Sequence, residues 1–492
     1  MDRRQFLSGV AAAGAAVGMP NSAMAAGLVE DRVPTEETIF HWIEEISSWG
    51  VRRPAYPADL QTEDACLEKF TQWGLESVRR EPVELLFWKP EDCRLEIRSG
   101  NRTESFPCFA VPYSASCELV DAEIARFDER APTKVTGKIS LGNVHLMRSR
   151  KAIRSPRLNP GMVAPDCVDV FERALWQFDP DKTLPQTDQI LPFSSEYQWV
   201  MEPSMEGGAL GFVGVLADFP GGQCCEQYVP YDAMPRAMPG AWISAQSGQE
   251  IQSLLAKGPV KANLRIRSVQ EKRSSHNIVG ELPGSDDELV IVGSHHDGPW
   301  SSAVEDASGV ALVLAQARYW SQLPASHRPH RMLFLLNAGH MAGGAGTRGF
   351  IGQHQDLLSR VVLEIHLEHA AAEFKEQGNT LVPTGLPEVR WWFTSKIARL
   401  RDALQRIIVE ERLDRSLILA ADAFAVAPPT DGGLFHLAKV PIVNFLTAPF
   451  YLFASIDTLD KIHKPSLVPL TRATIHLLDF TRGVSAKEWR QP

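Results

Sequence analysis

Histidine and carboxylate side chains gather directly after a short apolar segment of this chain, residues 289–294 (Leu-Val-Ile-Val-Gly-Ser). The five residues of this group that follow the segment are His295, His296, Asp297, Glu305 and Asp306. A short apolar run containing glycine is typical of a buried strand, and open α/β sheets bind ligands at the carboxyl ends of their strands. Helical spacing then begins at Ala307. The sequence therefore predicts a strand, a polar loop and a helix, with the chemistry located in the loop.

Two further apolar runs, at 332–336 and 361–367, end in the same kinds of side chain. The residues concerned are His340 after the first run and His366, Glu368 and His369 at the end of the second. A single histidine on an apolar strand is more often a hydrogen-bonded core residue than a ligand. Three strand ends in one sheet, each with histidine or carboxylate, favour a metal site instead, since both groups are zinc ligands.

The elements that must position these residues alternate regularly from Ser274 to the end of the chain. Strands are expected at about 289–295, 332–336, 361–367, 389–393 and 440–445, and helices at about 307–321, 346–359, 396–412 and 466–483. Alternating strands and helices predict an α/β fold with a mainly parallel sheet covered by helices on both faces.

The earlier part of the chain divides into two further regions. Residues 27–89 begin with helical spacing and end in a strand-like run, whereas residues 90–268 consist of short β-rich pieces with frequent Gly and Pro. Within the second region, about 145–201 forms a long segment without a clear period. Such a segment is either a solvated surface excursion or a lid over an active cleft. The predicted metal ligands all belong to the last region, 269–492.

Charge and cysteine content exclude several classes of protein. The 492 residues carry 60 acidic and 50 basic side chains, a net charge of −10, without a basic block suited to nucleic acid. All seven cysteines precede residue 226, so the strand-end chemistry uses no thiol, and the odd number leaves at least one unpaired. No apolar run after the amino terminus approaches the roughly 20 residues of a membrane span.

Residues 1–26 have the order of parts found in an export signal. Arg3 and Arg4 precede an apolar run rich in Ala and Gly at 10–18, and Ala23-Met24-Ala25 offers a cleavage site. The alternative is an amphipathic or disordered terminus. The twin arginines resemble a Tat signal, which implies a periplasmic or secreted protein.

From about residue 36 to the end, the chain resembles the co-catalytic zinc exopeptidases of the bacterial leucyl aminopeptidase and glutamate carboxypeptidase type. Residues 135–141, 207–215 and 239–244 resemble, in order, the landmarks of the protease-associated domain inserted in such enzymes. The family closes one strand with His-x-Asp, which His295-x-Asp297 matches. The resemblance implies that His295 binds metal and that Asp297 orients it.

Several family positions carry different residues here. Glu305 stands where the family has a bridging Asp, Gly339-His340 where it has a general base followed by a ligand, and Phe453 where it has its last histidine. Glu368 replaces another Asp ligand. The resemblance thus implies a rebuilt site for a divalent metal, zinc in the first place, as one or two ions. The implied ligands are His295, Glu305, His340 and Glu368, and the candidates for the missing base are Asp306, His366 and His369.

The reaction that this resemblance implies is hydrolysis of an amide or peptide-like bond in a small substrate. A cyclase-like or lyase-like metal enzyme on the same fold is an alternative, as is a non-catalytic binding homologue of the transferrin-receptor type. Glu305 is expected to be a ligand, whereas Asp306 opens the following helix and could be only its cap.

Overall fold

The computed structural model describes residues 27–148, 170–187, 190–195, 197–219, 222–424 and 426–490. The predicted export signal at 1–26 lies outside the described residues, as does part of the long segment at 145–201. Within the described residues, no helix is both long and apolar enough to cross a membrane.

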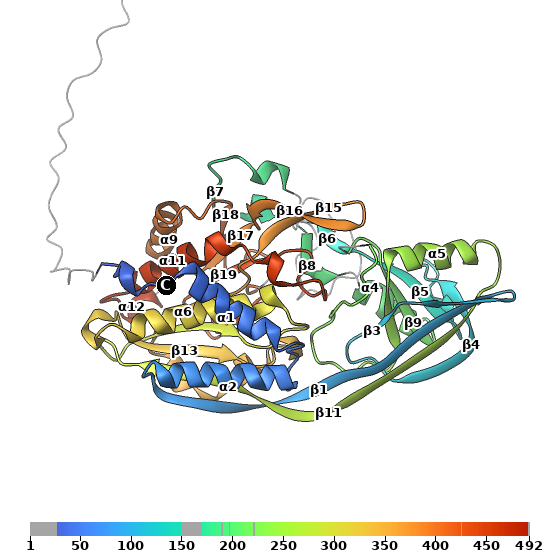
Figure 1. The fold of residues 1–492 in the computed structure, drawn as a ribbon, viewed down its shortest axis with the longest axis horizontal. Coiled ribbons are helices and arrows are strands. Elements are labelled where there is room, and N and C mark those ends of the chain that lie inside the picture. The colour runs from blue at the N-terminus through green and yellow to red at the C-terminus, as the bar shows by residue number, and fades with distance from the viewer. Residues whose placement is uncertain are drawn as a thin grey trace, which may run out of the picture.

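The larger part of the molecule is built on a mainly parallel sheet that we call the main sheet (Figure 1). Its four central strands lie in the order β13 (Arg331–Asn337), β12 (Leu289–His295), β14 (Val361–Leu367) and β19 (Ile442–Thr447). These four strands pair in parallel. Antiparallel strands flank them on both sides, so the sheet is mixed. The predicted α/β class and mainly parallel sheet are confirmed.

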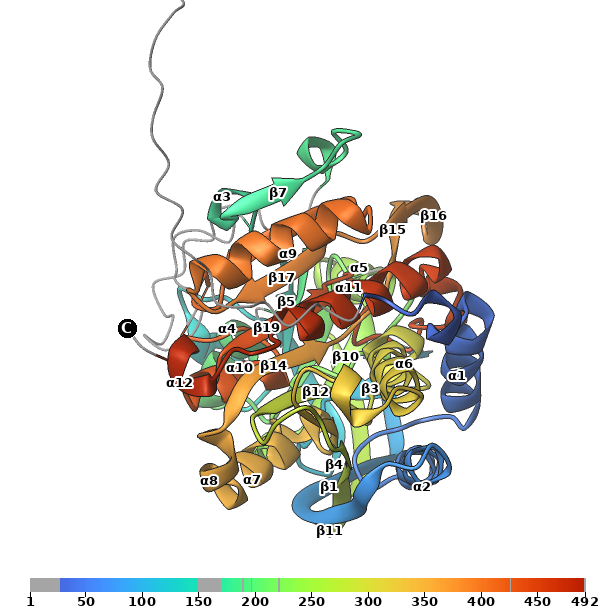
Figure 2. The ribbon, with the colours of Figure 1, turned by 90° about the vertical axis from the view of Figure 1, so that its left-hand side faces the viewer.

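Helices cover both faces of the main sheet, as predicted (Figure 2). Val290 and Val292 of β12 belong to the core on one face, and Leu289 and Ile291 to the core on the other. The first face packs against α1 (Glu36–Ser48), α2 (Pro57–Gln72), α6 (Gly309–Ser321) and α11 (Leu467–Phe480). The second packs against α7 (Ala345–Gln353), α8 (Gln355–Leu358) and α10 (Asp431–Leu437). Apolar residues that alternate in direction bury β12 on both sides.

The far edge of the main sheet was only partly expected. After β19 come β17 (Arg390–Thr394), β18 (Ser416–Ala420) and β7 (Trp176–Phe178), with α9 (Ala398–Glu410) beside them. β7 follows α3 (Val170–Arg173) and pairs with β18, so the long segment at 145–201 returns to the main sheet. This edge strand shows that residues 176–178 of the long segment belong to the main sheet.

Residues 90–268 build most of a smaller unit that we call the small lobe. Its strands lie in the order β3 (Phe109–Ala110), β10 (Gly240–Ser244), β9 (Gly211–Leu216), β5 (Ile139–Val144) and β4 (Cys117–Arg126). Two helices, α4 (Tyr197–Glu206) and α5 (Ala245–Leu255), pack on it. The three sequence landmarks correspond to β5, β9 and β10.

A long antiparallel ribbon joins the two units (Figure 1). It consists of β1 (Glu76–Ser99) and β11 (Lys261–Leu282), with β2 (Arg102–Phe106) on the outer side of β1. One end of β11 pairs with β13 of the main sheet and the other end with β4 of the small lobe. The expected boundaries at 89/90 and 268/269 therefore fall inside continuous strands, close to a register shift between Pro90 and Asp92.

Three small elements complete the fold. They are the hairpin of β15 (Ala372–Gln377) and β16 (Thr380–Pro387), the pair of β6 (Leu146–Arg148) and β8 (Ile190–Ser195), and the short helix α12 (Ala486–Trp489).

Candidate metal centre

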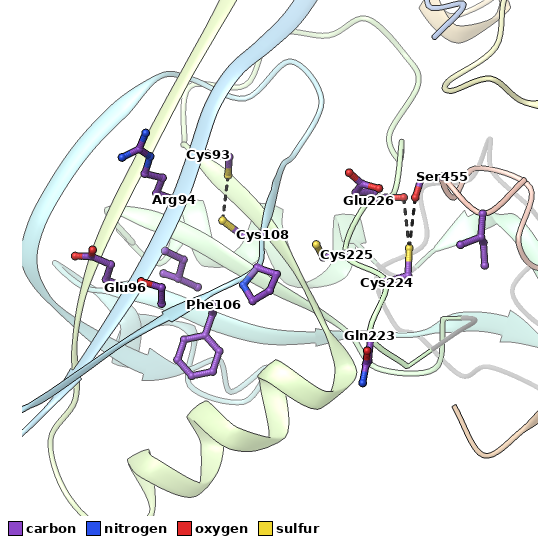
Figure 3. A pocket seen from close by; sticks show the side chains of 14 residues that line it. Cys93, Arg94, Glu96, Phe106, Cys108, Gln223, Cys224, Cys225, Glu226 and Ser455 are labelled. Carbon is purple, nitrogen blue, oxygen red and sulfur yellow. Dashed lines mark hydrogen bonds between the residues drawn. The ribbon is translucent and has the colours of Figure 1, made fainter. Parts of the chain in front are cut away.

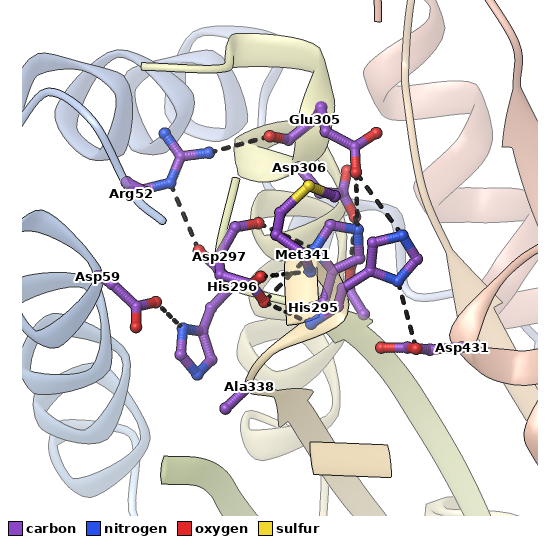
Figure 4. A network of polar contacts seen from close by, with 12 residues as sticks. Arg52, Asp59, His295, His296, Asp297, Glu305, Asp306, Ala338, Met341 and Asp431 are labelled. Atoms are coloured by element: carbon purple, nitrogen blue, oxygen red, sulfur yellow. Dashed lines mark hydrogen bonds and ion pairs between the residues drawn. The ribbon is translucent and has the colours of Figure 1, made fainter. Parts of the chain in front are cut away.

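The predicted ligands meet at the carboxyl ends of three neighbouring parallel strands. His295 is the last residue of β12, His340 lies three residues after β13, and Glu368 directly follows β14. Because β13, β12 and β14 are adjacent, these three ends lie side by side. The loop between β12 and α6 brings Glu305 into the same place (Figure 4). The prediction that neighbouring strand ends bring these residues together agrees with the geometry.

Glu305 lies at the centre of the group. One of its carboxylate oxygens, Oε1, is 3.3 Å from Nε2 of His295 and 3.9 Å from Nε2 of His340. The other, Oε2, is 2.6 Å from Nε2 of His369. Glu368 lies beside them, with Oε2 3.8 Å from Nε2 of His369. Two sets of three donors, His295-Glu305-His340 and His295-Glu368-His369, have their ligand atoms within 4.8 Å of one another.

Several of these atoms are buried and have no hydrogen-bond partner, although they face each other at ion-pair distance. They are Nε2 of His295 and of His369 and both carboxylate oxygens of Glu305. Buried polar atoms almost always find a partner. Unpartnered imidazole nitrogens and carboxylate oxygens that converge on one point are suited to a divalent cation, so the residues fit the metal that the sequence predicts.

The other ring nitrogen fixes the orientation of two histidines. Nδ1 of His295 is 2.9 Å from the main-chain oxygen of Asp297, and Nδ1 of His369 is 2.7 Å from that of Thr447. A carbonyl oxygen only accepts hydrogen bonds, so Nδ1 carries the proton in both rings. When the rings are neutral, each Nε2 therefore offers a lone pair to the centre.

In the absence of a metal ion, the mutual attraction of these side chains would favour their charged forms. Burial opposes a charge on His340, but Asp431, with Oδ1 3.2 Å from Nδ1, raises the pKa of His340 to about 10. Burial likewise opposes a charge on His369, and Glu305 raises its pKa to about 10. Although burial works against ionisation, His369 and His295 lower the pKa of Glu305. A metal ion would take the place of protons held by these imidazoles.

Asp306 has no free oxygen for chemistry. Its Oδ1 accepts hydrogen bonds from the main-chain nitrogens of Gly309 and His369, at 2.9 and 3.2 Å, and its Oδ2 accepts one from the Ser294 hydroxyl. It therefore caps α6 and holds the His369 main chain. The geometry gives no support to Asp306 as the general base.

Asp297 contacts both His295 and the turn after β13. Its carboxylate is 3.9 Å from Nδ1 of His295, farther than its own main-chain oxygen. The two carboxylate oxygens accept hydrogen bonds from the main-chain nitrogens of His340 and Met341, at 3.0 and 2.7 Å (Figure 4). Asp297 therefore orients His295 through its main-chain oxygen, while its carboxylate fixes the turn that carries His340.

His366 lies between two carboxylates. Its Nδ1 is 3.0 Å from Glu364 and its Nε2 is 3.1 Å from Glu368. Burial opposes its charge, but these two neighbours raise its pKa well above the ordinary value. With an acceptor at each nitrogen, His366 holds both protons. It therefore supports Glu368, and the geometry does not favour it as a base.

Two residues outside the predicted set of site residues, Asp457 and Arg52, position Glu305. The Asp457 carboxylate accepts hydrogen bonds from the main-chain nitrogens of Val304 and Glu305, both at 2.9 Å. Arg52 is completely buried and donates to four main-chain oxygens of the loop after β12 (Figure 4). Those acceptors belong to His296, Ser301, Ser302 and Glu305. No local sequence motif predicts such contacts, because they join segments about 150 to 250 residues apart.

The two positions where the sequence departs most from the family are structurally fixed. Gly339 has φ +69°, and a Cβ atom there would lie 3.3 Å from both Ala345 and Leu85, so a larger residue would be strained. Phe453 is buried, and Tyr231 of the small lobe stacks on it and on His340, with ring centroids 4.9 and 5.6 Å apart. Aromatic rings thus occupy the side of the centre where the family would have another histidine.

A second buried group of possible ligands, Asp59, Glu63 and His296, does not have the character of a metal site. Nδ1 of His296 donates to Asp59 at 2.8 Å and Nε2 to the main-chain oxygen of His276 at 2.9 Å. Ser275 donates to both carboxylates, and His276 donates to Glu63. Since the hydrogen bonds satisfy these groups, the cluster is a structural network behind the centre.

Comparison with known proteins agrees with this fold. Residues 277–478 match the sequence model of peptidase family M28. A peptidase M28 precursor from Shewanella amazonensis SB2B has a TM-score of 0.67 at 19% identity, over 90% of this chain and 92% of that one. An aminopeptidase from Aneurinibacillus sp. strain AM-1 gives 0.59 at 17% identity, over 92% and 95%. A zinc aminopeptidase from Bacillus subtilis gives 0.61 at 14% identity, over 90% and 95%.

No curated protein matches the sequence. The family match and the shared fold confirm the predicted resemblance to the zinc exopeptidases.

Proposed function

Since residues 277–478 match peptidase family M28, we propose that this protein is a metal-dependent hydrolase of peptide or related amide bonds in small substrates. The observation that supports this function is the convergence of buried, unpartnered imidazole and carboxylate atoms on Glu305. The proposed ligands are His295, Glu305, His340 and Glu368. Zinc is the proposed metal because imidazole and carboxylate suit it.

One ion is proposed, for a reason of donor chemistry. Both sets of three donors contain His295, whose Nδ1 is occupied by the Asp297 carbonyl. Only Nε2 is left to bind, and one imidazole nitrogen binds one ion. The two sets therefore cannot hold separate ions at the same time. Phe453, in place of a family ligand, agrees with a single ion.

A bound divalent metal supplies Lewis acidity to a carbonyl or a water molecule. Hydrolysis also requires that a side chain of this protein accept the proton of the attacking water molecule. Gly339, at the family's base position, has no side chain that could accept it. Of the three predicted bases, Asp306 is saturated with hydrogen bonds and His366 already holds two protons. His369 remains: its Nδ1 proton is donated to the Thr447 carbonyl, and the proton that Glu305 holds on its Nε2 in the absence of a metal ion would be released when Glu305 binds the metal. We assign the transferred proton to Nε2 of His369, with Glu305 stabilising the resulting charge.

His369→Gln is expected to retain the metal and to lower kcat by about 10²–10⁴, the usual contribution of a general base. The amide is polar and uncharged but cannot take up a proton. Metal content and steady-state kinetics should be measured on the same preparation. Loss of metal in parallel with activity would instead make His369 a ligand, in the set with His295 and Glu368.

The function itself is tested with the wild-type protein purified without added metal. Elemental analysis is expected to find one zinc per chain, and the enzyme is expected to cleave aminoacyl anilides or short peptides. A chelator should remove both properties, and zinc should restore both. Two zinc ions per chain would contradict the single-ion centre, and absence of stoichiometric metal would favour a non-catalytic binding protein.

One observation favours a second candidate, a metal enzyme that does not hydrolyse peptides. Gly339 leaves the family's base position empty, and its left-handed backbone makes a glutamate there costly. A protein with one zinc that cleaves no peptide, but cyclises or eliminates small oxygenated or amino-terminal substrates, would support this candidate. Export through a Tat signal at 1–26 is part of the proposal, and fractionation of the producing cell tests it.

A further inference from the structure

Four of the seven cysteines line one cavity outside the metal centre (Figure 3). The cavity has a volume of about 700 Å³ and lies where the β1–β2 hairpin faces the segment after β9. Cys93 and Cys108 belong to the hairpin side, and Cys224 and Cys225 to the opposite side. This volume is in the range of ordinary ligand pockets and is sufficient for a small organic molecule.

Cys93 and Cys108 are the closest pair in this cavity. Their sulfur atoms are 3.4 Å apart, and both residues are partly exposed. The strand register gives the reason for this contact. Leu95 of β1 pairs with Phe106, the last residue of β2, and Cys93 and Cys108 each lie two residues beyond this last pair. The end of the β1–β2 hairpin thus brings the two cysteines together, although Cys108 itself lies outside β2.

We propose that Cys93 and Cys108 form a disulfide by exchange with a low-molecular-weight disulfide that enters this cavity. One cysteine, as the thiolate, attacks a sulfur of the incoming disulfide and expels one thiolate. The other cysteine then attacks the mixed disulfide and expels the second thiolate. The two cysteine protons end on the two released thiols, so the protein pair is oxidised and the incoming disulfide is reduced to two thiols.

The surroundings favour the disulfide over the free thiols. The hydrogen bond with Cys108, followed by burial, raises the pKa of Cys93, and burial raises the pKa of Cys225 to about 12. A thiol with a high pKa is a poor leaving group, so the protein disulfide resists cleavage once it has formed. The cross-link would tie β1 to the chain after β2, at the place where the β1–β11 ribbon enters the small lobe.

A metal–thiolate site formed by the same cysteines is an alternative with less support than the disulfide. Within the described part of the chain, the groups of three possible ligands that lie within 4.8 Å contain no cysteine. The remaining described cysteines offer controls, because they lie outside the cavity. Cys66 is fully buried with its thiol pKa raised by burial to about 12, and Cys117 donates to the Leu264 carbonyl at 3.4 Å.

The test uses the full chain, reduced and then equilibrated with mixtures of glutathione and glutathione disulfide. The samples are quenched in acid, unfolded and alkylated, and the labels are counted by intact mass. The reduced protein should take seven labels, one for each cysteine, and the oxidised protein two fewer. Peptide mapping of the wild type should find the Cys93–Cys108 cross-link, which requires no variant to fold.

Two variants complete the test. Cys117→Ser should lower every label count by one and keep the cross-link, whereas Cys93→Ser should abolish the loss of two labels. Seven labels at every redox ratio would overturn the proposal. A stable mixed disulfide with glutathione, or a cross-link involving Cys224 or Cys225, would overturn it equally. None of these results depends on metal content or hydrolysis, so failure here leaves the proposed function untouched.

Discussion

Glu305→Gln is expected to abolish metal binding and hydrolysis while leaving thermal unfolding nearly unchanged. The amide has the shape of the carboxylate but lacks the charge that two imidazoles and a metal ion require. Removing an outer partner of a metal ligand typically weakens binding by 10 to 100-fold, so the loss of this ligand should exceed about 100-fold. Zinc affinity by competition with a chromogenic chelator, together with kcat/KM, measures the effect.

Asp306→Asn is the matched control for that change. Its carboxylate accepts three hydrogen bonds; the amide oxygen of Asn can keep the two from main-chain nitrogens, but the amide nitrogen would face the Ser294 hydroxyl, which donates to the carboxylate in the wild type. The expected result is a loss of about 1–3 kcal/mol in the free energy of unfolding, with a smaller loss of zinc affinity than Glu305→Gln causes. If the order of the two effects on zinc were reversed, Asp306 would be the ligand.

His295→Ala and His296→Ala are expected to have opposite consequences although the residues are adjacent. His295→Ala removes a metal ligand and should eliminate bound zinc and activity with a modest effect on unfolding. His296→Ala leaves the buried Asp59 carboxylate without its charged partner, which costs about 3–5 kcal/mol. Zinc content and denaturant unfolding of both variants check the pair. Equal loss of zinc in both would show that His296 also reaches the metal.

The His296–Asp59 pair also gives a pH dependence with a definite sign. Burial opposes the charge on His296, but Asp59 raises its pKa from 6.5 to about 9 in the folded protein. The stabilisation is therefore complete below about pH 6.5 and is lost as the pH rises through about 9. Wild-type protein should lose more stability than His296→Ala between these values. Parallel stability profiles of the two proteins would contradict this assignment.

The sequence was most informative where strand ends carry histidine or carboxylate. The apolar runs at 289–294, 332–336 and 361–367 correspond to β12, β13 and β14, and the residues after them share one centre. This succeeds because parallel neighbours place their carboxyl ends together whatever the details of the loops. The four helices expected from periodicity correspond to α6, to α7 with α8, to α9 and to α11, whereas the short helices α10 and α12 were not expected.

Other parts depend on distant contacts that a single sequence does not show. β18 is a short apolar strand that pairs with β7, more than 200 residues earlier in the chain. The sequence around each strand therefore does not indicate which strand it pairs with. The roles of Asp306, His366 and His369 differ only in their partners. Two of those partners, the Gly309 nitrogen and the Thr447 oxygen, are main-chain atoms that exist at nearly every residue and identify nothing in advance.

The β1–β11 ribbon has a consequence for any attempt to divide this protein. β11 pairs with β13 at one end and β4 at the other, and β1 accompanies it along its length. A fragment cut at 89/90 or 268/269 would expose unpaired strand edges, which favour aggregation. The small lobe is therefore not a removable module. β11 runs from the small lobe to β13, and the turn after β13 carries His340. A truncation within the lobe would therefore disturb the metal-binding half of the molecule.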